Sequence, residues 1–144
     1  MFRLSKTVTF EAAHRLPHHD GKCARLHGHS WKATIVLEGD MLVDEGPKAG
    51  MLVDYADMAA PLKALWESHL DHHHLNETTG LENPTSEQLA VWMYWELLPH
   101  LPMLRSVVVE ETCTSRCEYI PPVLRQGPLA GSPYDLSYHR KERA

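Results

Sequence analysis

The sequence predicts one α+β domain, with a four-stranded antiparallel sheet that carries two helices on one face. Apolar and polar residues alternate through 27–38, which is typical of a half-buried strand. A capped segment that begins at residue 85 has the apolar spacing of a helix. The elements follow in the order two strands, two helices, two strands. A chain of 144 residues is long enough for one such domain and too short for two ordinary ones.

The first two strands are expected at residues 7–14 and 27–38, with a polar loop at 17–23 between them. The second strand has the clearest pattern in the chain. Because strand side chains alternate between faces, one of its faces carries His27, His29, Trp31, Ala33, Ile35 and Leu37.

A first helix is expected to run from an Asp54 cap to about His69, but Pro61 lies inside it. Proline removes a backbone donor and clashes with the preceding turn, so this helix either begins later than Asp54 or bends. A second helix is better marked. Thr85 caps it, Gln88 completes a Thr-x-x-Gln capping box, and Pro99 ends it.

The last two strands are expected at residues 104–112 and 116–120. After Ile120 the chain changes character, because Pro121 and Pro122 open a segment rich in proline and glycine. We therefore expect a single domain over residues 1–120 and a C-terminal tail over residues 121–144.

The composition narrows the classes of partner. A formal charge of −5 gives no reason to expect nucleic acid or an acidic membrane surface. No apolar run approaches the length that spans a bilayer, and the first ten residues lack the apolar core of a signal peptide. Three cysteines, an odd number, do not suggest a disulfide framework. These features predict a cytoplasmic protein with reduced thiols.

The segment from Cys23 to His29 holds the strongest chemical signal. His27 and His29 point to the same face of a strand and are half of a zinc site. His14, at the end of the neighbouring strand, is the best third ligand. Cys23 is either a ligand or a reactive thiolate that the flanking Lys22 and Arg25 stabilise, and the spacing leaves both open. An ordinary strand pair without a metal is the alternative to a zinc site.

Two further groups stand out. Asp71 precedes His72, and a carboxylate beside an imidazole can form a proton relay, although such a pair is also common in loops. Glu111 shares a strand face with Val107 and Val109, where a carboxylate is costly unless it meets a partner. There it could accept two N–H bonds from a guanidine-like edge. The alternative is that the strand ends by Glu110 and both glutamates are solvated.

Five motifs occur in order along residues 2–120, and together they resemble the 6-pyruvoyl-tetrahydropterin synthase family. Within that family the chain is most similar to the bacterial branch of 6-carboxy-5,6,7,8-tetrahydropterin synthases. The motifs are Phe10-Glu11-Ala12-Ala13-His14, Cys23-x-x-x-His27-Gly28-His29, Leu70-Asp71-His72-His73, Glu82-Asn83-Pro84-Thr85-Ser86-Glu87 and Glu111-Thr112-Cys113-Thr114.

The resemblance implies a role for each matching residue. It makes His14, His27 and His29 zinc ligands, and Cys23 the catalytic cysteine rather than a ligand. Asp71 and His72 become the other members of the catalytic relay, and Glu111 becomes the anchor of the pterin ring. It also implies the tunnelling fold, in which subunits join their sheet edges into trimeric barrels. Two trimers stack as a homohexamer, with active sites at the subunit interfaces.

The implied activity is that of a zinc-dependent carbon–carbon lyase in queuosine biosynthesis. It would convert 7,8-dihydroneopterin triphosphate to 6-carboxy-5,6,7,8-tetrahydropterin, acetaldehyde and triphosphate. The alternative is the formation of 6-pyruvoyl tetrahydropterin on the same fold. The three-residue gap between Cys23 and His27 and the run that ends at Cys117 favour the carboxy-forming branch. His74 departs from the family, since relatives commonly have tyrosine there.

Overall fold

The computed structural model describes residues 1–122 of the chain. Its strands are β1 (Phe2–His14), β2 (His27–Gly39), β3 (His73–His74), β4 (Leu104–Thr112) and β5 (Ser115–Tyr119). Its helices are α1 (Tyr55–Leu65), α2 (Leu75–Thr78) and α3 (Ser86–Leu97), with a 3₁₀ turn η1 (Lys22–Ala24) and a π-helical turn η2 (Trp66–Leu70). The strands form one sheet in the order β3-β1-β2-β4-β5. The α+β prediction is confirmed.

Strands β1 and β2 pair antiparallel along their full length and determine where the histidines meet. The register places His14 opposite His27 and Ala12 opposite His29. Because side chains alternate, all three histidines and Trp31 lie on the same face. The predicted face of β2 is confirmed, since its residues from Trp31 to Leu37 are at most 1% exposed.

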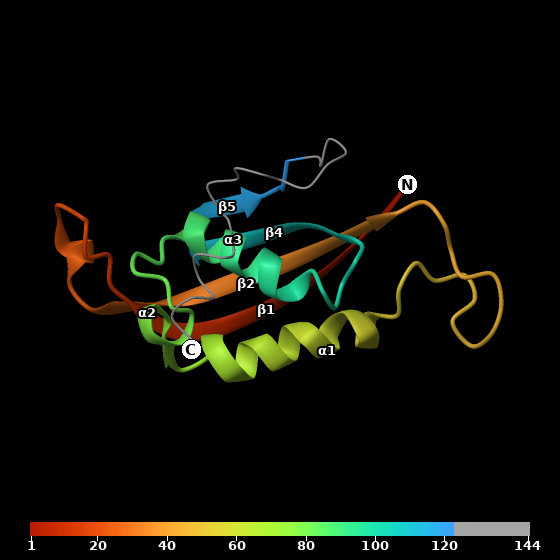
Figure 1. Cartoon of the computed structure of the whole chain (residues 1–144), viewed down its shortest axis with the longest axis horizontal. Coiled ribbons are helices and arrows are strands. Elements are labelled where there is room, and N and C mark those ends of the chain that lie inside the picture. Colours follow the sequence, from red (N-terminus) through yellow and green to blue (C-terminus); the bar gives the residue numbers. More distant parts are fainter. Residues whose placement is uncertain (123–144) are drawn as a thin grey trace.

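Helices α1 and α3 both pack on this face of the sheet; in Figure 1, α3 crosses in front of the strands and α1 runs below β1. Met58 and Leu62 from α1 and Leu89 and Met93 from α3 share one core with the strand residues, and all four are fully buried. Both predicted N-caps are present. The Asp54 side chain accepts from the Ala56 N–H at 2.8 Å, and the Thr85 hydroxyl accepts from the Gln88 N–H at 3.2 Å.

Helix α1 begins directly after Asp54 and continues through Pro61, so the later start is wrong. Proline removes one hydrogen bond. The burial of Leu62 beside it, and of Met58 one turn earlier, offsets that loss. The α-helix ends at Leu65, and the chain then widens into the π-helical turn η2 rather than continuing to His69.

The prediction of four antiparallel strands is wrong in one respect, because the sheet has five strands and is mixed. β3 contains only two residues and pairs parallel to β1, opposite Ala12 and Ala13. A strand this short has no recognisable alternation, so only the tertiary structure reveals it. β1 is also longer than predicted, because Phe2–Lys6 pairs with the end of β2. From residue 123 on, the predicted tail lies outside the described residues.

The face of the sheet that the helices leave open is polar. Thr7 and Thr34 share a hydrogen bond of 2.7 Å across β1 and β2, and the ammonium of Lys32 lies 3.1 Å from a carboxylate oxygen of Glu110. Such side chains suit a solvated surface rather than a second packed sheet. No helix within residues 1–122 has the length and apolarity to cross a membrane.

Candidate active site

The three predicted metal-binding histidines meet at one end of the sheet. One ring nitrogen from each of His14, His27 and His29 lies within 4.8 Å of the other two. His14 is fully buried, whereas the other two are partly exposed. The strand register produces this cluster, because it brings the last residue of β1 beside the first residue of β2. The group could therefore hold a metal ion.

Two backbone carbonyls fix the protonation of these rings. Nδ1 of His14 lies 2.9 Å from the Pro84 carbonyl, and Nδ1 of His27 lies 2.7 Å from the Arg25 carbonyl. A carbonyl only accepts, so each Nδ1 donates and each neutral ring presents a lone pair on Nε2. Carbonyl partners of this kind commonly orient metal-ligating histidines.

Desolvation favours the neutral form of His14 and of His29. Burial lowers the pKa of His14, outweighing the Pro84 carbonyl and Glu111, which raise it. Burial also lowers the pKa of His29, again against the charge of Glu111. Neutral imidazole is the form that binds metal, so the environment prepares both side chains as ligands.

Nε2 of His29 is the most informative single atom of the site. It lies 3.2 Å from Oε1 of Glu111, within ion-pair distance. However, it is buried and makes no hydrogen bond, so the approach lacks hydrogen-bond geometry. A buried nitrogen left without a hydrogen bond is costly. A cation bound by the three Nε2 lone pairs would satisfy it, so the residues present fit a divalent metal.

Glu111 lies beside the histidines and under the start of α3. The β4–β5 register shifts between Glu110 and Thr112, so Glu111 occupies a bulge, and bulges commonly re-aim side chains next to active sites. Its second oxygen accepts from the Ser86 hydroxyl at 3.3 Å. The strand continues to Thr112, so the alternative that it ends by Glu110 is wrong. Glu110 pairs with Lys32 on the other face.

Asp71 and His72 form a separate unit at the outer edge of β1. The Asp71 carboxylate accepts the Glu11 N–H on Oδ1 at 3.0 Å. Its Oδ2 lies 2.7 Å from Nδ1 of His72, which donates because a carboxylate accepts. The Glu11 N–H bond is the largest cause that lowers the pKa of Asp71, and the hydrogen bond from His72 adds to it. In the neutral ring, Nε2 of His72 then carries the lone pair.

The backbone around this pair is unusual. His72 has φ of 58°, the one positive value at a non-glycine residue in the described part of the chain. Its N–H donates to the Glu11 carbonyl at 2.7 Å, which holds this left-handed conformation. The π-helical turn before it is held to β1, because the Trp66 indole donates to the Thr9 carbonyl at 2.8 Å. π-Helical turns and positive φ values are both frequent at functional sites.

Cys23 lies in η1, in the loop between β1 and β2. Its carbonyl accepts the Leu16 N–H at 2.8 Å, and its free thiol is partly exposed. Among residues 1–122, the group with metal-ligand geometry consists of histidines alone, so Cys23 is not brought into it. Within the same residues, no hydrogen bond or ion pair joins Cys23 or the Asp71–His72 pair to the three histidines.

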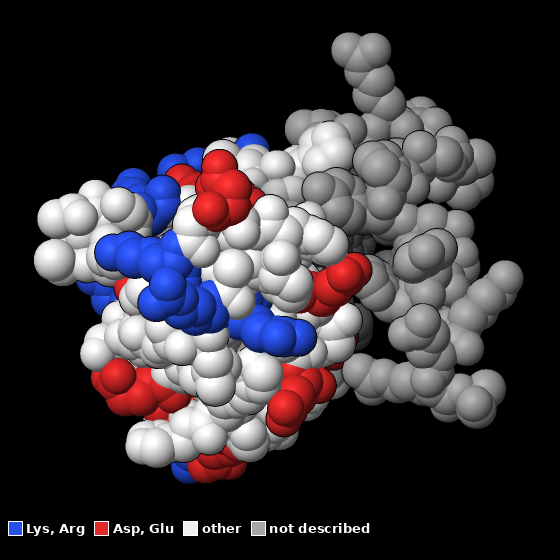
Figure 2. Space-filling model, turned by 90° about the vertical axis from the view of Figure 1, so that its left-hand side faces the viewer, with Lys and Arg blue, Asp and Glu red and all other residues white. Residues whose placement is uncertain are grey.

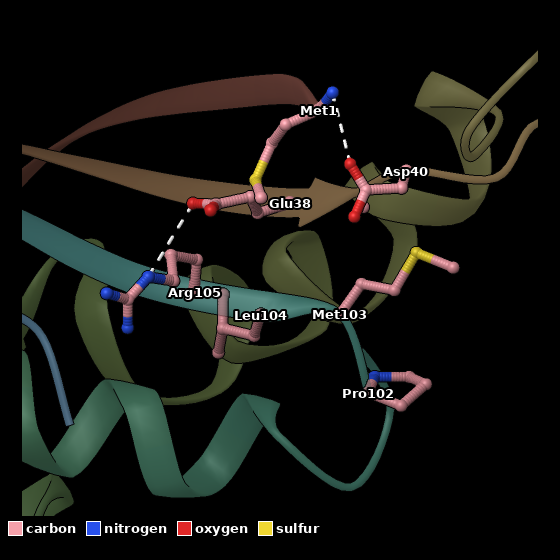
Figure 3. A pocket seen from close by; sticks show the side chains of 8 residues that line it. Met1, Glu38, Asp40, Pro102, Met103, Leu104 and Arg105 are labelled. Carbon is pink, nitrogen blue, oxygen red and sulfur yellow. Dashed lines mark ion pairs between the residues drawn. The ribbon is translucent and has the colours of Figure 1, made fainter. Parts of the chain in front are cut away.

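A cleft of about 550 Å³ lies at this end of the sheet. Its walls come from residues 11–13 of β1, residues 28–30 of β2 and His72–His74. A second hollow lies at the opposite end, where Figure 3 shows Met1 facing Asp40 and Arg105 facing Glu38. Its ion pairs span 3.1 and 3.6 Å. This second hollow contains none of the predicted site residues.

The sequence patterns missed three groups that hold the site together. They are the Pro84 carbonyl on His14, the Ser86 hydroxyl on Glu111, and the backbone of Glu11 beneath the Asp71–His72 pair. Each of these residues lies in one of the five motifs, and this is the feature of the sequence that could have indicated their importance. No spacing rule connects residues this far apart in the chain.

Comparisons with known proteins identify the family of the chain. The family model described as 6-pyruvoyl tetrahydropterin synthase matches residues 3–122. A Synechocystis protein named 6-carboxy-5,6,7,8-tetrahydropterin synthase is 46% identical over 125 residues, which cover 86% of this chain and 97% of that protein. A Bacillus subtilis protein of the same name is 34% identical over 143 residues, covering 90% of each chain.

A solved structure gives the same result at the level of the fold. The 6-pyruvoyl tetrahydropterin synthase of Caenorhabditis elegans superimposes with a TM-score of 0.72 at 25% identity. The match covers 84% of this chain and 96% of the nematode chain. The predicted resemblance and the tunnelling fold are therefore confirmed, with the mixed sheet as the one correction. The chain belongs to the 6-pyruvoyl tetrahydropterin synthase family.

Proposed function

We propose that this protein is a zinc-dependent carbon–carbon lyase of queuosine biosynthesis. Its reaction converts 7,8-dihydroneopterin triphosphate to 6-carboxy-5,6,7,8-tetrahydropterin, acetaldehyde and triphosphate. The observation that carries the proposal is the convergence of three imidazoles beside Glu111. The names of the Synechocystis and Bacillus relatives support the carboxy product.

His14, His27 and His29 would hold the metal. Three nitrogen ligands with one position left for substrate are typical of a catalytic zinc, and imidazole suits that ion. When bound, zinc supplies a Lewis acid that polarises the hydroxyl oxygens of the substrate side chain. The rest of the proposed chemistry belongs to residues of this chain.

Glu111 would orient the pterin ring. The aminopyrimidinone edge of a pterin offers two parallel N–H groups, and a carboxylate accepts such a pair in bidentate fashion. Ser86 supports the proposal, because its hydroxyl holds one carboxylate oxygen from the first turn of α3. The ring edge would thus be fixed on the same side as the metal ligands.

Cys23 and His72 would transfer protons. The Cys23 thiolate would remove a proton from the substrate side chain, and His72, oriented by Asp71, would move another. The bond between the first and second side-chain carbons then breaks, and the outer two carbons leave as acetaldehyde. Triphosphate leaves by elimination, and one water supplies the second oxygen of the carboxylate that forms on the first carbon. The first carbon is oxidised to a carboxylate while the ring is reduced, so no nicotinamide is needed.

Two subunits would supply one active site, within a trimer or hexamer. His72 has 78% of its side chain exposed, so its imidazole is free to reach a neighbouring chain. Strand β1 also has an open edge, since its pairing with β3 extends only over Ala12 and Ala13. An exposed strand edge is a ready template for another strand. Both features favour sites that neighbouring subunits complete.

The triphosphate would meet basic side chains around the active-site end. Figure 2 shows the left-hand end of Figure 1 face-on, and Lys and Arg side chains gather there. The loop at this end carries the exposed residues Arg15, Lys22 and Arg25. A local positive patch on a chain of net charge −5 favours an anionic ligand.

The deciding experiment is product analysis. The zinc-loaded protein is incubated with 7,8-dihydroneopterin triphosphate, with and without a chelator, and products are identified by mass spectrometry. We expect metal-dependent 6-carboxytetrahydropterin with one equivalent of acetaldehyde. A 6-pyruvoyl product would move the protein to the alternative branch, and the absence of turnover would overturn the proposal.

A further inference from the structure

Asn76 connects the two chain segments that position His14. It lies near the start of α2, just after the His72–His74 run. Its side-chain oxygen accepts the Arg15 N–H at 3.0 Å, and its side-chain nitrogen donates to the Arg15 carbonyl at 2.9 Å. The same nitrogen donates to the Glu82 carbonyl at 3.0 Å. One amide therefore binds backbone groups of two segments.

Both segments act directly on the buried ligand. Arg15 follows His14 in the chain. The two hydrogen bonds to its N–H and C=O therefore hold the backbone at the end of β1, from which the His14 side chain extends. Glu82 precedes Pro84 by two residues, and the Pro84 carbonyl accepts the Nδ1–H of His14. His14 is thus held from its backbone and from its far ring nitrogen by segments that Asn76 ties together.

The bonds of Asn76 leave it no donor for a ligand. An amide has two N–H donors and one oxygen acceptor, and all three bond to backbone here. The pairing with Arg15 imitates a strand, because the side chain exchanges an N–H and a C=O with one residue. It continues the contact of β3 with β1 two residues beyond Ala13. This arrangement is suited to positioning rather than to substrate contact.

We propose that Asn76 is a positioning residue for the metal site, because it ties the backbone next to His14 to the Glu82–Pro84 segment that holds the His14 ring. This inference rests on the proposed metal function of the three histidines. Partners that orient a metal-ligating histidine typically change metal affinity about 10-fold to 100-fold when they are removed. Asn76 holds the segment that carries such a partner, the Pro84 carbonyl, and it also holds the backbone next to His14.

The test is a zinc affinity measurement by competition with a chromogenic chelator, with cobalt absorption as a second readout. Asn76→Ala should weaken zinc binding about 10-fold to 100-fold and alter the visible cobalt bands. Asn76→Asp should weaken zinc binding at least as much, because its second oxygen would face the carbonyls of Arg15 and Glu82. Circular dichroism of the metal-free proteins checks that they fold. Should Asn76→Ala not fold, Asn76→Ser, which retains one hydroxyl, is measured in the same way.

Thr78→Val is the matched control. The Thr78 hydroxyl also lies on α2 and also bonds to backbone, but it donates to the His69 carbonyl at 2.7 Å, not to β1. We expect unchanged zinc affinity in this variant. Equal zinc binding and equal cobalt spectra in wild type and Asn76→Ala would overturn the inference, as would equal losses in Asn76→Ala and Thr78→Val. Failure of the wild type to bind zinc would instead overturn the proposed function.

Discussion

His14 and His27 present their Nε2 atoms to each other at 3.1 Å. Because Pro84 and Arg25 take the Nδ1 protons, both facing nitrogens of the neutral rings carry lone pairs. A cation held between these two nitrogens would accept both lone pairs, which supports the proposed metal site.

Zinc should stabilise the fold, and His27→Ala should abolish this effect. At a free zinc concentration about 100 times the Kd, the gain is about 2.7 kcal/mol, or roughly 10 °C in Tm for a domain of this size. Thermal scans with zinc and with chelator measure this shift in each protein. His69→Ala, a histidine outside the cluster, should retain the full zinc shift.

Glu111→Gln should impair pterin binding while zinc binding is retained. Exchanging a bidentate carboxylate for an amide removes about 1.5–3 kcal/mol of charge-assisted hydrogen bonding, equivalent to roughly a 10-fold to 150-fold rise in KM or in the Kd of a pterin. Glu110→Gln is the control, because its side chain pairs with Lys32 on the opposite face. Equal KM values for Glu111→Gln and wild type would remove Glu111 from the pterin site.

Cys23→Ala should bind zinc and pterin normally but lose turnover. Elemental analysis measures bound zinc, a pterin titration measures pterin binding, and product formation measures turnover. Cys117→Ser is the control, since burial raises the pKa of the Cys117 thiol and keeps it protonated. If Cys23→Ala lost its zinc, the cysteine would be a metal ligand and the proposed proton transfer would be wrong.

Mixing two inactive variants should restore activity if neighbouring subunits complete each site. Cys23→Ala and His72→Ala are each expected to be inactive. Co-refolded in equal amounts, they place an intact Cys23 opposite an intact His72 in about a quarter of the interfaces. We expect about a quarter of wild-type activity per site. Activity that stays at the level of the separate variants would place both residues in one subunit's site.

Asp71 should make stability depend on pH in the acidic range. Its folded-state pKa lies below the ordinary value of 3.8, chiefly because it accepts the Glu11 N–H. The carboxylate therefore adds stability that is fully present above the ordinary pKa and is lost as the pH falls through the lowered one. Urea unfolding of wild type and Asp71→Asn should differ by a constant amount at pH 5–7, and the difference should shrink below about pH 4. A difference that did not change with pH would show that charge is not involved.

The sequence by itself determined the α+β class, the two long strands, both helix caps and the cluster of three histidines. These follow from local rules, because alternation, capping and the His-x-His spacing act within a few residues or across one strand pair. It also determined the face of Glu111, which lies beside His29 although a bulge interrupts the β4–β5 pairing at this residue.

Only the tertiary structure decided how the site is held. The two-residue strand β3, the π-helical turn η2 and the positive φ of His72 leave no pattern in the sequence, because each depends on contacts with β1. Pro84 lies 70 residues from His14, and Asn76 lies 61 residues from Arg15. Contacts at such separations are decided by how the whole chain packs, and no local periodicity encodes them.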